Sequence, residues 1–381
     1  MPPTTSRDGI FWAGVNDRIT DLFEGLWPVA PGRVSYNADL VRGERAAVVD
    51  LATAIKVDEF LDPVAAGAEP RALEFVVINH MEPGHSGLVR TLPRIAPQVT
   101  RMGSEKTVAL LDPFYGIRRN VRAAANGEAL SLGNRSLRLF PTPLVHWPGT
   151  MMTLEESERV LFSCDAFGGY GALRGGAFDD QCPNLGAYEA EALRYDANIV
   201  AGLSPMGLTA IAQLAAVPVE VIAPSHGLIW RKSPHRIVEL YERWARYAQG
   251  PGDLGLTLLC RSMYGNSEKV MNAVAKGASA EGVPVEIFDV TRAHVLDMAG
   301  RKAVRAKKVA RFGSYGWSGG ARGELERWFE TLRWDQVLEP LEFVGAPSDA
   351  ELEQGERFGR SFGKALRKAA SPSPHEGGGT P

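Results

Sequence analysis

Several common functional signals are missing from this chain of 381 residues. It has three cysteines and no Cys-x-x-Cys pair, which argues against a disulfide framework and a four-cysteine iron site. Its formal net charge is −3, so no overall basic field indicates nucleic-acid binding. No apolar run approaches the ~18 residues of a membrane-spanning helix. Its first residues lack the basic and apolar segments of a secretory signal. We expect a reduced, cytoplasmic protein that acts on neither nucleic acid nor membranes.

The composition that is present is globular, with 45% hydrophobic and 23% charged residues, and the length suits two domains. A helix-breaking stretch, Gln249-Gly250-Pro251-Gly252-Asp253, marks the boundary. We predict one domain over residues 1–250, a second over 251–370, and a disordered tail over 371–381. Residues 1–8 are expected to form a loose arm.

The first half of the chain mixes strand-like and helical patterns. Two apolar runs within residues 33–51 flank Arg42-Gly43-Glu44 and predict a hairpin. Apolar spacing predicts helices over 187–196, 206–215 and 233–249. Further strands are predicted at 73–79, 107–111, 136–140, 159–164, 198–201 and 219–223.

After the boundary the pattern changes to regular alternation. Residues 254–260 form a continuous apolar run, as a strand buried in a parallel sheet requires. The predicted order that follows is helix 267–281, strands 284–289 and 307–313, helix 321–333, strand 340–344 and helix 349–369. This alternation predicts a small, doubly wound α/β domain with a parallel sheet.

Metal-ligand residues gather at the ends of the apolar runs in the first half. His80, Glu82 and His85 fall within six residues, directly after Phe75-Val76-Val77-Ile78. His146, Asp165 and His226 each follow a later predicted strand. Strand ends can lie side by side in a layered sheet domain, so these residues can meet at one metal site. Each histidine alone could instead be an ordinary hydrogen-bonded residue, and Asp165 could cap the turn that follows it.

This order of ligands resembles that of the flavodiiron proteins, also known as A-type flavoproteins. The spacings are 61 residues from His85 to His146, 19 to Asp165 and 61 to His226. The resemblance implies a metallo-β-lactamase-like αββα sandwich followed by a flavodoxin-like domain. It also implies two irons, one held by His80, Glu82 and His146, the other by His85 and His226, with Asp165 bridging them. Hydrolases of this fold usually have histidine where Glu82 stands, and a carboxylate there favours iron over zinc.

Gly84 departs from the pattern of that family, which usually has aspartate at this place. Glycine has no side chain that can bind metal, so the second iron would lose one anionic oxygen. Glycine could also serve only to ease a tight turn.

Two loops in the second half match a flavin site. The first follows strand 254–260 and opens a helix, where loop amides and hydroxyls can hold a phosphate. The second interleaves glycines with aromatic rings that can line a flat cofactor, although it could be a turn with packing aromatics. Both resemble the FMN loops of flavodoxin-like domains. The residues concerned are Ser262, Met263, Tyr264, Gly265, Asn266 and Ser267, and Gly313, Ser314, Tyr315, Gly316 and Trp317.

The flavodoxin-like domain is short between residues 290 and 306. Only 17 residues separate the strand ending at Asp289 from the one beginning at Lys307. One parallel crossover alone needs about a dozen residues, so this interval holds one connection and no extra strand. The central strand of the sheet is therefore predicted to be missing, and with it a flavin-contacting loop that the family carries there.

The resemblance implies an oxidoreductase that passes electrons from an external donor, such as a rubredoxin or a flavin reductase, through FMN to two irons. The substrate would be O2, reduced to water, or NO, reduced to N2O. Family members form head-to-tail homodimers, some of them dimers of dimers. No catalytic residue is expected beyond the metal ligands. One alternative is a degenerate diiron protein that senses O2 or NO, and a weaker one is a hydrolase of the metallo-β-lactamase fold.

Overall fold

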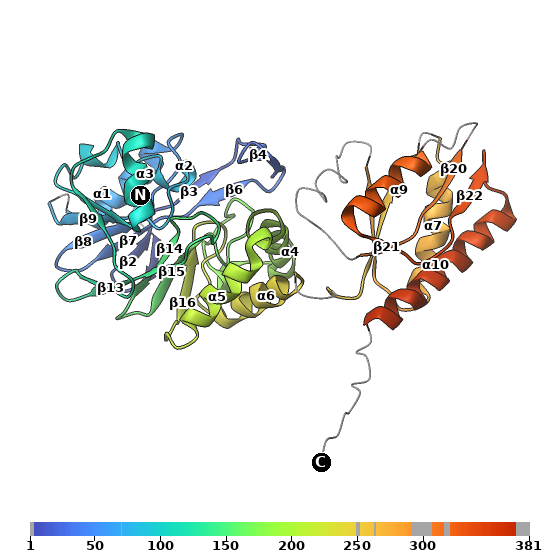
Figure 1. The fold of residues 1–381 in the computed structure, drawn as a ribbon. Coiled ribbons are helices and arrows are strands. Elements are labelled where there is room, and N and C mark those ends of the chain that lie inside the picture. Colours follow the sequence, from blue (N-terminus) through green and yellow to red (C-terminus); the bar gives the residue numbers. More distant parts are fainter. Residues whose placement is uncertain are drawn as a thin grey trace, which may run out of the picture. The chain divides into compact units, whose positions relative to one another are not determined.

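The computed structural model describes residues 4–69, 71–248, 252–262, 264–290, 307–315 and 321–370. The chain forms two compact units that divide between residues 248 and 249 (Figure 1). Each unit has hydrophobic clusters of its own.

A seven-stranded sheet forms one half of the first unit. Its strands, in spatial order, are β1 (Thr4–Arg7), β2 (Ile10–Trp12), β7 (Asp39–Arg42), β8 (Ala46–Val49), β9 (Leu73–Val77), β10 (Thr100–Gly103) and β11 (Val121–Ala123). β7 and β8 are antiparallel, which confirms the hairpin, whereas β8 to β11 run parallel. The loose arm predicted over residues 1–8 is wrong, because Thr4–Arg7 pair with β2 and gain backbone hydrogen bonds there.

A five-stranded sheet forms the other half. Its order is β12 (Ala129–Ser131), β13 (Ser136–Pro141), β14 (Met151–Glu155), β15 (Val160–Cys164) and β16 (Val221–Pro224). Only β15 and β16 run parallel. Two small hairpins stand apart, formed by β3 (Val15–Asp17) with β6 (Val34–Tyr36) and by β4 (Leu22–Phe23) with β5 (Trp27–Pro28).

The central strands are buried on both faces, and their side chains alternate between two hydrophobic clusters. In β8, Ala47 and Val49 enter one cluster while Ala46 and Val48 enter the other. Successive side chains of a strand point to opposite faces. The buried residues of the cluster with Ala47 and Val49 come from strands and loops and not from α-helices. The cluster with Ala46 and Val48 also contains buried residues of α1 and α3 to α6. The unit is therefore the αββα sandwich that the resemblance implied.

The helices of this unit are α1 (Val57–Gly67), α2 (Pro83–Ser86), α3 (Glu105–Tyr115), α4 (Leu185–Tyr195), α5 (Ser204–Leu214) and α6 (Pro234–Arg246). Short 3-10 turns occur at Leu92–Arg94, Asp179–Gln181 and Ala201–Leu203, and Asp196–Val200 is π-helical. In Figure 1, α4, α5 and α6 gather on the side of β16.

Two predicted strands are wrong. Residues 107–111 lie in α3, which begins where Ser104 Oγ accepts a hydrogen bond from Thr107 N and ends at Gly116 with φ of +67°. Both are helix-end signals, and they outweigh the short apolar run between them. Residues 198–201 lie in the π-helical and 3-10 turns that continue α4, where Ile199 and Val200 pack into the core.

One helical stretch, Leu185–Leu214, has the length and apolar composition of a membrane-crossing helix. It is not one regular helix, because it passes from α4 through a π-helical and a 3-10 turn into α5. Ala192, Tyr195 and Ala210 belong to the hydrophobic core. The stretch is therefore weak evidence for a membrane span.

The second unit alternates strands and helices. Its elements are β17 (Leu256–Cys260), α7 (Asn266–Ser279), β18 (Val285–Asp289), β19 (Lys308–Val309), β20 (Phe312–Tyr315), α9 (Ala321–Leu332), β21 (Asp335–Gln336), β22 (Leu341–Val344) and α10 (Asp349–Ala370). β17 pairs with β18, β19 with β21 and β20 with β22, all in parallel. Among these described strands no hydrogen-bonded ladder joins β17 to β20.

One predicted strand of this unit is divided. Residues 307–313 form β19 and β20, which pair with different neighbours. Ala310 and Arg311 separate them, and the buried guanidinium of Arg311 pairs with Glu326 of α9 at 2.9 Å. The predicted absence of a central strand over 290–306 falls almost wholly on residues 291–306, which lie outside the described residues, as does the tail over 371–381.

Two glycines let α7 and α10 approach closely. A Cβ at Gly359 would lie 2.0 Å from the carbonyl oxygen of Val274, and one at Gly277 would lie 2.0 Å from that of Glu356. We therefore expect Gly359→Ala to destabilise the second unit by about 1–3 kcal/mol through overpacking. Thermal unfolding followed by circular dichroism measures this. Gly323→Ala in α9 is the control, since its Cβ meets nothing within 4 Å. Equal melting temperatures for the two variants would contradict the close approach.

Candidate metal centre

The six predicted ligands come together at one edge of the sandwich, because each lies just beyond a strand. His80 and Glu82 follow β9, and His85 lies in the single-turn helix α2. His146 lies in the loop between β13 and β14, Asp165 directly follows β15, and His226 follows β16. Their ligand atoms form two groups, one of His80, Glu82, His146 and Asp165, the other of His85, Asp165 and His226.

Asp165 belongs to both groups, and its two carboxylate oxygens face different ones. Oδ2 lies 3.1 Å from Nε2 of His80 and 3.2 Å from Nε2 of His146. Oδ1 lies 3.4 Å from Nε2 of His85 and 3.6 Å from Nε2 of His226. Glu82 Oε2 adds a second carboxylate to the first group, 3.4 Å from His80 and 3.7 Å from His146. This is the geometry of two adjacent metal positions that share one carboxylate.

The donor atoms of this cluster are buried without adequate hydrogen bonds from the described residues. Both ring nitrogens of His80 and His85, Nε2 of His226 and both oxygens of Asp165 lack a partner there. Unsatisfied buried polar groups are costly and rare, so these residues fit metal ions that would satisfy them. His226 is also oriented from behind, because its Nδ1 lies 2.6 Å from the carbonyl oxygen of Ser35, which directs Nε2 inwards.

In the second unit, the structure brings the two predicted flavin loops together. Gly265, with φ of +79°, precedes α7, so the loop of Ser262 and Tyr264 to Ser267 leads into the amino end of that helix. Ser267 Oγ lies 3.3 Å from Ser314 Oγ in β20, the strand that also holds Gly313 and Tyr315. Loops that meet at the carboxyl ends of parallel strands commonly bind ligands. Met263, Gly316 and Trp317 lie outside the described residues.

The sequence is similar to known proteins over nearly its whole length. A family model described as "ODP family beta lactamase" matches residues 34–227, about half of the chain. A type A flavoprotein of Rhodobacter capsulatus is 30% identical, over 97% of this chain and 93% of its own. This chain belongs to the flavodiiron family. A nitric oxide reductase of Moorella thermoacetica is 28% identical, over 94% of this chain and 98% of its own.

Solved structures confirm the flavodiiron fold over nearly the whole chain. The rubredoxin oxygen:oxidoreductase of Desulfovibrio gigas is 26% identical, with a TM-score of 0.87 over 97% of this chain and 100% of that one. The flavodiiron protein of Giardia intestinalis has a TM-score of 0.89 over 97% of this chain and 98% of that one, at 22% identity, and it supports the fold alone.

Charge in the metal-free centre of this flavodiiron chain is distributed between carboxylates and histidines. Burial lowers the pKa of His80, but the charges and contacts of Asp165 and Glu82 together outweigh it and raise that pKa to about 9. Burial likewise opposes protonation of His146, but contacts with Asp165 and Glu82 raise its pKa to about 10. Burial and the charge of His85 lower the pKa of His226 to about 4. At neutral pH, His80 and His146 are therefore protonated and His226 is neutral.

Metal binding must displace these protons, because a histidine binds metal through an unprotonated nitrogen. We expect Zn²⁺ or Fe²⁺ to release at least about two protons at pH 7 when it binds the metal-free chain. Apparent affinity should rise with pH, by up to about a hundredfold per unit while both histidines are protonated. Calorimetry in buffers of different ionisation enthalpy counts the protons. His235→Gln, outside the centre, should leave the number unchanged, and release near zero would contradict the assignment.

The structure adds one carboxylate that sequence reasoning missed. Asp50 directly follows β8, is buried, and accepts a hydrogen bond from Asn79 N at 2.8 Å. Burial raises its pKa to about 6, although the charge of His85 opposes this. Its position after a buried strand is the signal that identified Asp165, so the same rule could have found it.

Glu24 is a second carboxylate beside the centre, at the turn between β4 and β5. Burial of its carboxyl group, and then the charge of Glu82, raise its pKa to about 7. A glutamate in a short polar turn has no sequence signal of this role, since the hairpin reaches the centre only in the folded unit.

Gly84 lies in α2, and its φ is not in the left-handed region. The backbone therefore does not require glycine, and the tight-turn alternative has no support in the conformation. Space is the constraint, because a Cβ there would lie 2.7 Å from Cε1 of Tyr36 and 3.1 Å from Oε1 of Glu82. The second metal position is left with His85, His226 and the shared Asp165.

Proposed function

We propose that this chain is a flavodiiron-type oxidoreductase that uses electrons from an external donor, carried by FMN and two irons, to reduce O2 to water or NO to N2O. The observation that carries the proposal is the position of Asp165, a buried carboxylate between two groups of histidines. Relatives named for nitric oxide reduction, and a solved neighbour named for rubredoxin-dependent oxygen reduction, support both substrates.

The proposed ligands of the first iron are His80, Glu82 and His146, and those of the second are His85 and His226, with Asp165 bridging. Mixed imidazole and carboxylate donors suit iron. Ser262 and Tyr264 to Ser267 would hold the FMN phosphate at the amino end of α7, and Gly313 to Tyr315 would lie along the flavin. Met263, Gly316 and Trp317 complete the proposed FMN site.

When bound, FMN and the irons would supply the electrons that reduction of O2 or NO consumes. Aromatic side chains of the chain shield the proposed metal centre from solvent. Trp147 stands edge-on to His80 with ring centres 5.1 Å apart, and Phe23 and Tyr36 stand edge-on to His226 at 5.1 and 5.2 Å. Only Glu82 and His146 among the ligands have side chains more than 10% exposed. Solvent therefore reaches the centre at the first metal position.

The partners follow from the same proposal. An external donor such as rubredoxin or a flavin reductase would reduce the flavin, and a head-to-tail homodimer, or a dimer of dimers, would bring one flavin close to the metal centre of its partner. Light scattering measures the oligomeric state. Nothing in the proposal calls for nucleic acid or a membrane, and a cytoplasmic location suits a chain whose three cysteines form no disulfide.

Metal analysis, a visible spectrum and gas consumption test the proposal together on the purified chain. We expect two irons and one FMN per chain, with consumption of O2 or NO after a reductant is added. A protein that holds iron but has no flavin and no turnover would contradict the reductase and favour the sensor, which the absent ligand at Gly84 makes the second candidate. Zinc alone, with ester or thioester hydrolysis, would instead indicate the hydrolase.

A further inference from the structure

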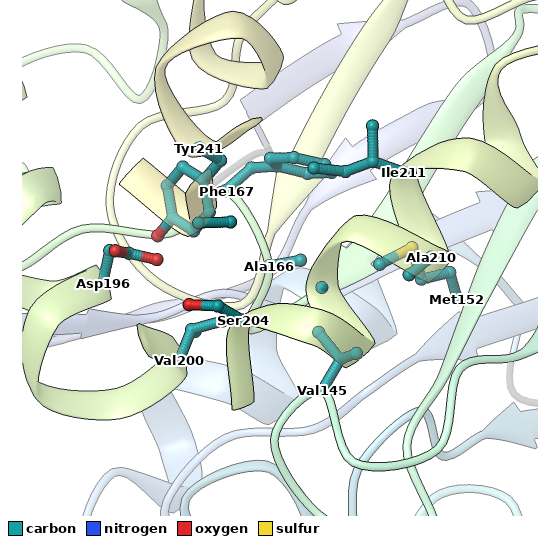
Figure 2. A pocket seen from close by; sticks show the side chains of 12 residues that line it. Val145, Met152, Ala166, Phe167, Asp196, Val200, Ser204, Ala210, Ile211 and Tyr241 are labelled. Atoms are coloured by element: carbon teal, nitrogen blue, oxygen red, sulfur yellow. The ribbon is translucent and has the colours of Figure 1, made fainter. Parts of the chain in front are cut away.

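A small cavity lies in the first unit, between the loops after β13 and β15, the π-helical turn, α5 and α6 (Figure 2). Its volume is about 20 Å³ for the centre of a water-sized sphere. A single water molecule needs roughly 10–15 Å³ on this measure, so the cavity is slightly larger than one water. Nine of its lining residues are apolar or aromatic, among them Val145, Met152, Ala166, Phe167, Val200 and Ala210.

The polar groups around this cavity have their hydrogen bonds elsewhere. Tyr241 Oη donates to the carbonyl oxygen of Gly168 at 2.7 Å, and Ser204 Oγ donates to that of Ala201 at 2.7 Å. Asp196 also has an interaction partner. The surface that faces the space is therefore apolar. Water needs two to four polar partners to occupy such a space, whereas apolar cavities stay dry and accept xenon or other apolar molecules.

The walls of the cavity connect directly to the metal centre. Val145 precedes the proposed ligand His146, and Ala166 and Phe167 follow Asp165. All three are buried, and Figure 2 shows their side chains around the cavity. A molecule held there would be separated from the centre only by the segments that carry two of its ligands.

We infer that this cavity is a docking site for a small apolar gas molecule, of the class of O2 and NO, beside the metal centre. The inference rests on the proposed function for its physiological ligand, but not for the binding itself. Both gases are small and weakly hydrogen-bonding, so a dry apolar cavity favours them over water. The cavity would raise their local concentration next to the centre.

Crystals of the full chain pressurised with xenon test the binding. Xenon should occupy the cavity in the unaltered protein and be lost from Ala210→Leu. Ala210 is buried and lines the cavity from α5 (Figure 2), so the larger side chain would take up the space. Ala212→Leu is the matched control, since Ala212 lies in the same helix, is exposed and does not line the cavity. An absence of xenon from the cavity in the unaltered protein would overturn the inference.

Gas kinetics test the role. Ala210→Leu should raise KM for O2 or NO about threefold or more with kcat little changed, as expected when access is reduced and chemistry is not. An unchanged KM, with xenon excluded from that variant, would show that the cavity does not serve the centre. A protein without iron and without turnover would contradict the proposed function. The xenon result would still decide whether the cavity binds gas.

Discussion

Asp165→Asn is expected to empty both metal positions, because Asp165 is the only one of the six ligands that faces both groups. Its oxygens lie 3.1–3.6 Å from Nε2 of four histidines. An amide keeps the shape of the side chain but loses its charge, and its nitrogen turns a donor towards one of the two groups. Loss of a group that only hydrogen-bonds a metal ligand already lowers metal affinity about 10–100-fold. Loss of a bridging ligand should therefore lower the affinity by at least about a hundredfold at each position.

Metal content by mass spectrometry measures this loss, with the visible spectrum of the flavin as a second readout. Iron should fall from two per chain to nearly none while FMN is retained, since FMN would bind in the other unit. Asp39→Asn is the matched control. Asp39 is a buried carboxyl whose pKa is raised well above its usual value by burial and the charge of Asp50, and it lies outside both groups. Two irons retained in Asp165→Asn would refute the bridging role.

The ligands could be predicted because each obeys a local rule. His80, His146, Asp165 and His226 follow apolar strands, and strand ends in a layered sheet lie at common edges. Asp50 obeys the same rule, since it directly follows β8. Glu24 and Tyr36 obey no such rule. They lie in or next to two small hairpins, β4 with β5 and β3 with β6, whose packing against the centre is tertiary.

Local patterns failed where the ends of an element decided its type. Residues 107–111 have the apolar run of a strand, but Ser104 and Gly116 define a helix around them. Residues 198–201 were predicted as a strand from their apolar character. A helical turn buried against the core has the same composition as a buried strand, so a short apolar run does not distinguish the two. The strand predicted over 307–313 was divided because its two parts pair with different strands further along the chain, β21 and β22. Such a pairing has no short-range signal.

Gly84→Asp is expected to tighten the second metal position and to destabilise the metal-free protein. The new carboxylate would add an anionic oxygen beside His85 and His226, which should improve affinity there by about tenfold or more. Without metal it costs stability for two reasons. Its Cβ would lie 2.7 Å from the Tyr36 ring, and its charge would be added beside Glu82. Overpacking of this kind costs about 1–3 kcal/mol.

Gly84→Ala separates the two effects, because it adds the same Cβ without a ligand. Both variants should melt below the unaltered protein when metal is removed by a chelator. Only Gly84→Asp should regain or exceed the original melting temperature when iron is added, since metal binds the folded state. Tyr36→Leu removes Cε1 and gives the aspartate room, so the double variant tests the ligand if Gly84→Asp alone folds poorly. The comparison is made both with Tyr36 and with Tyr36→Leu. If the aspartate and alanine variants bind iron equally in both backgrounds, the absent carboxylate does not weaken the second metal position.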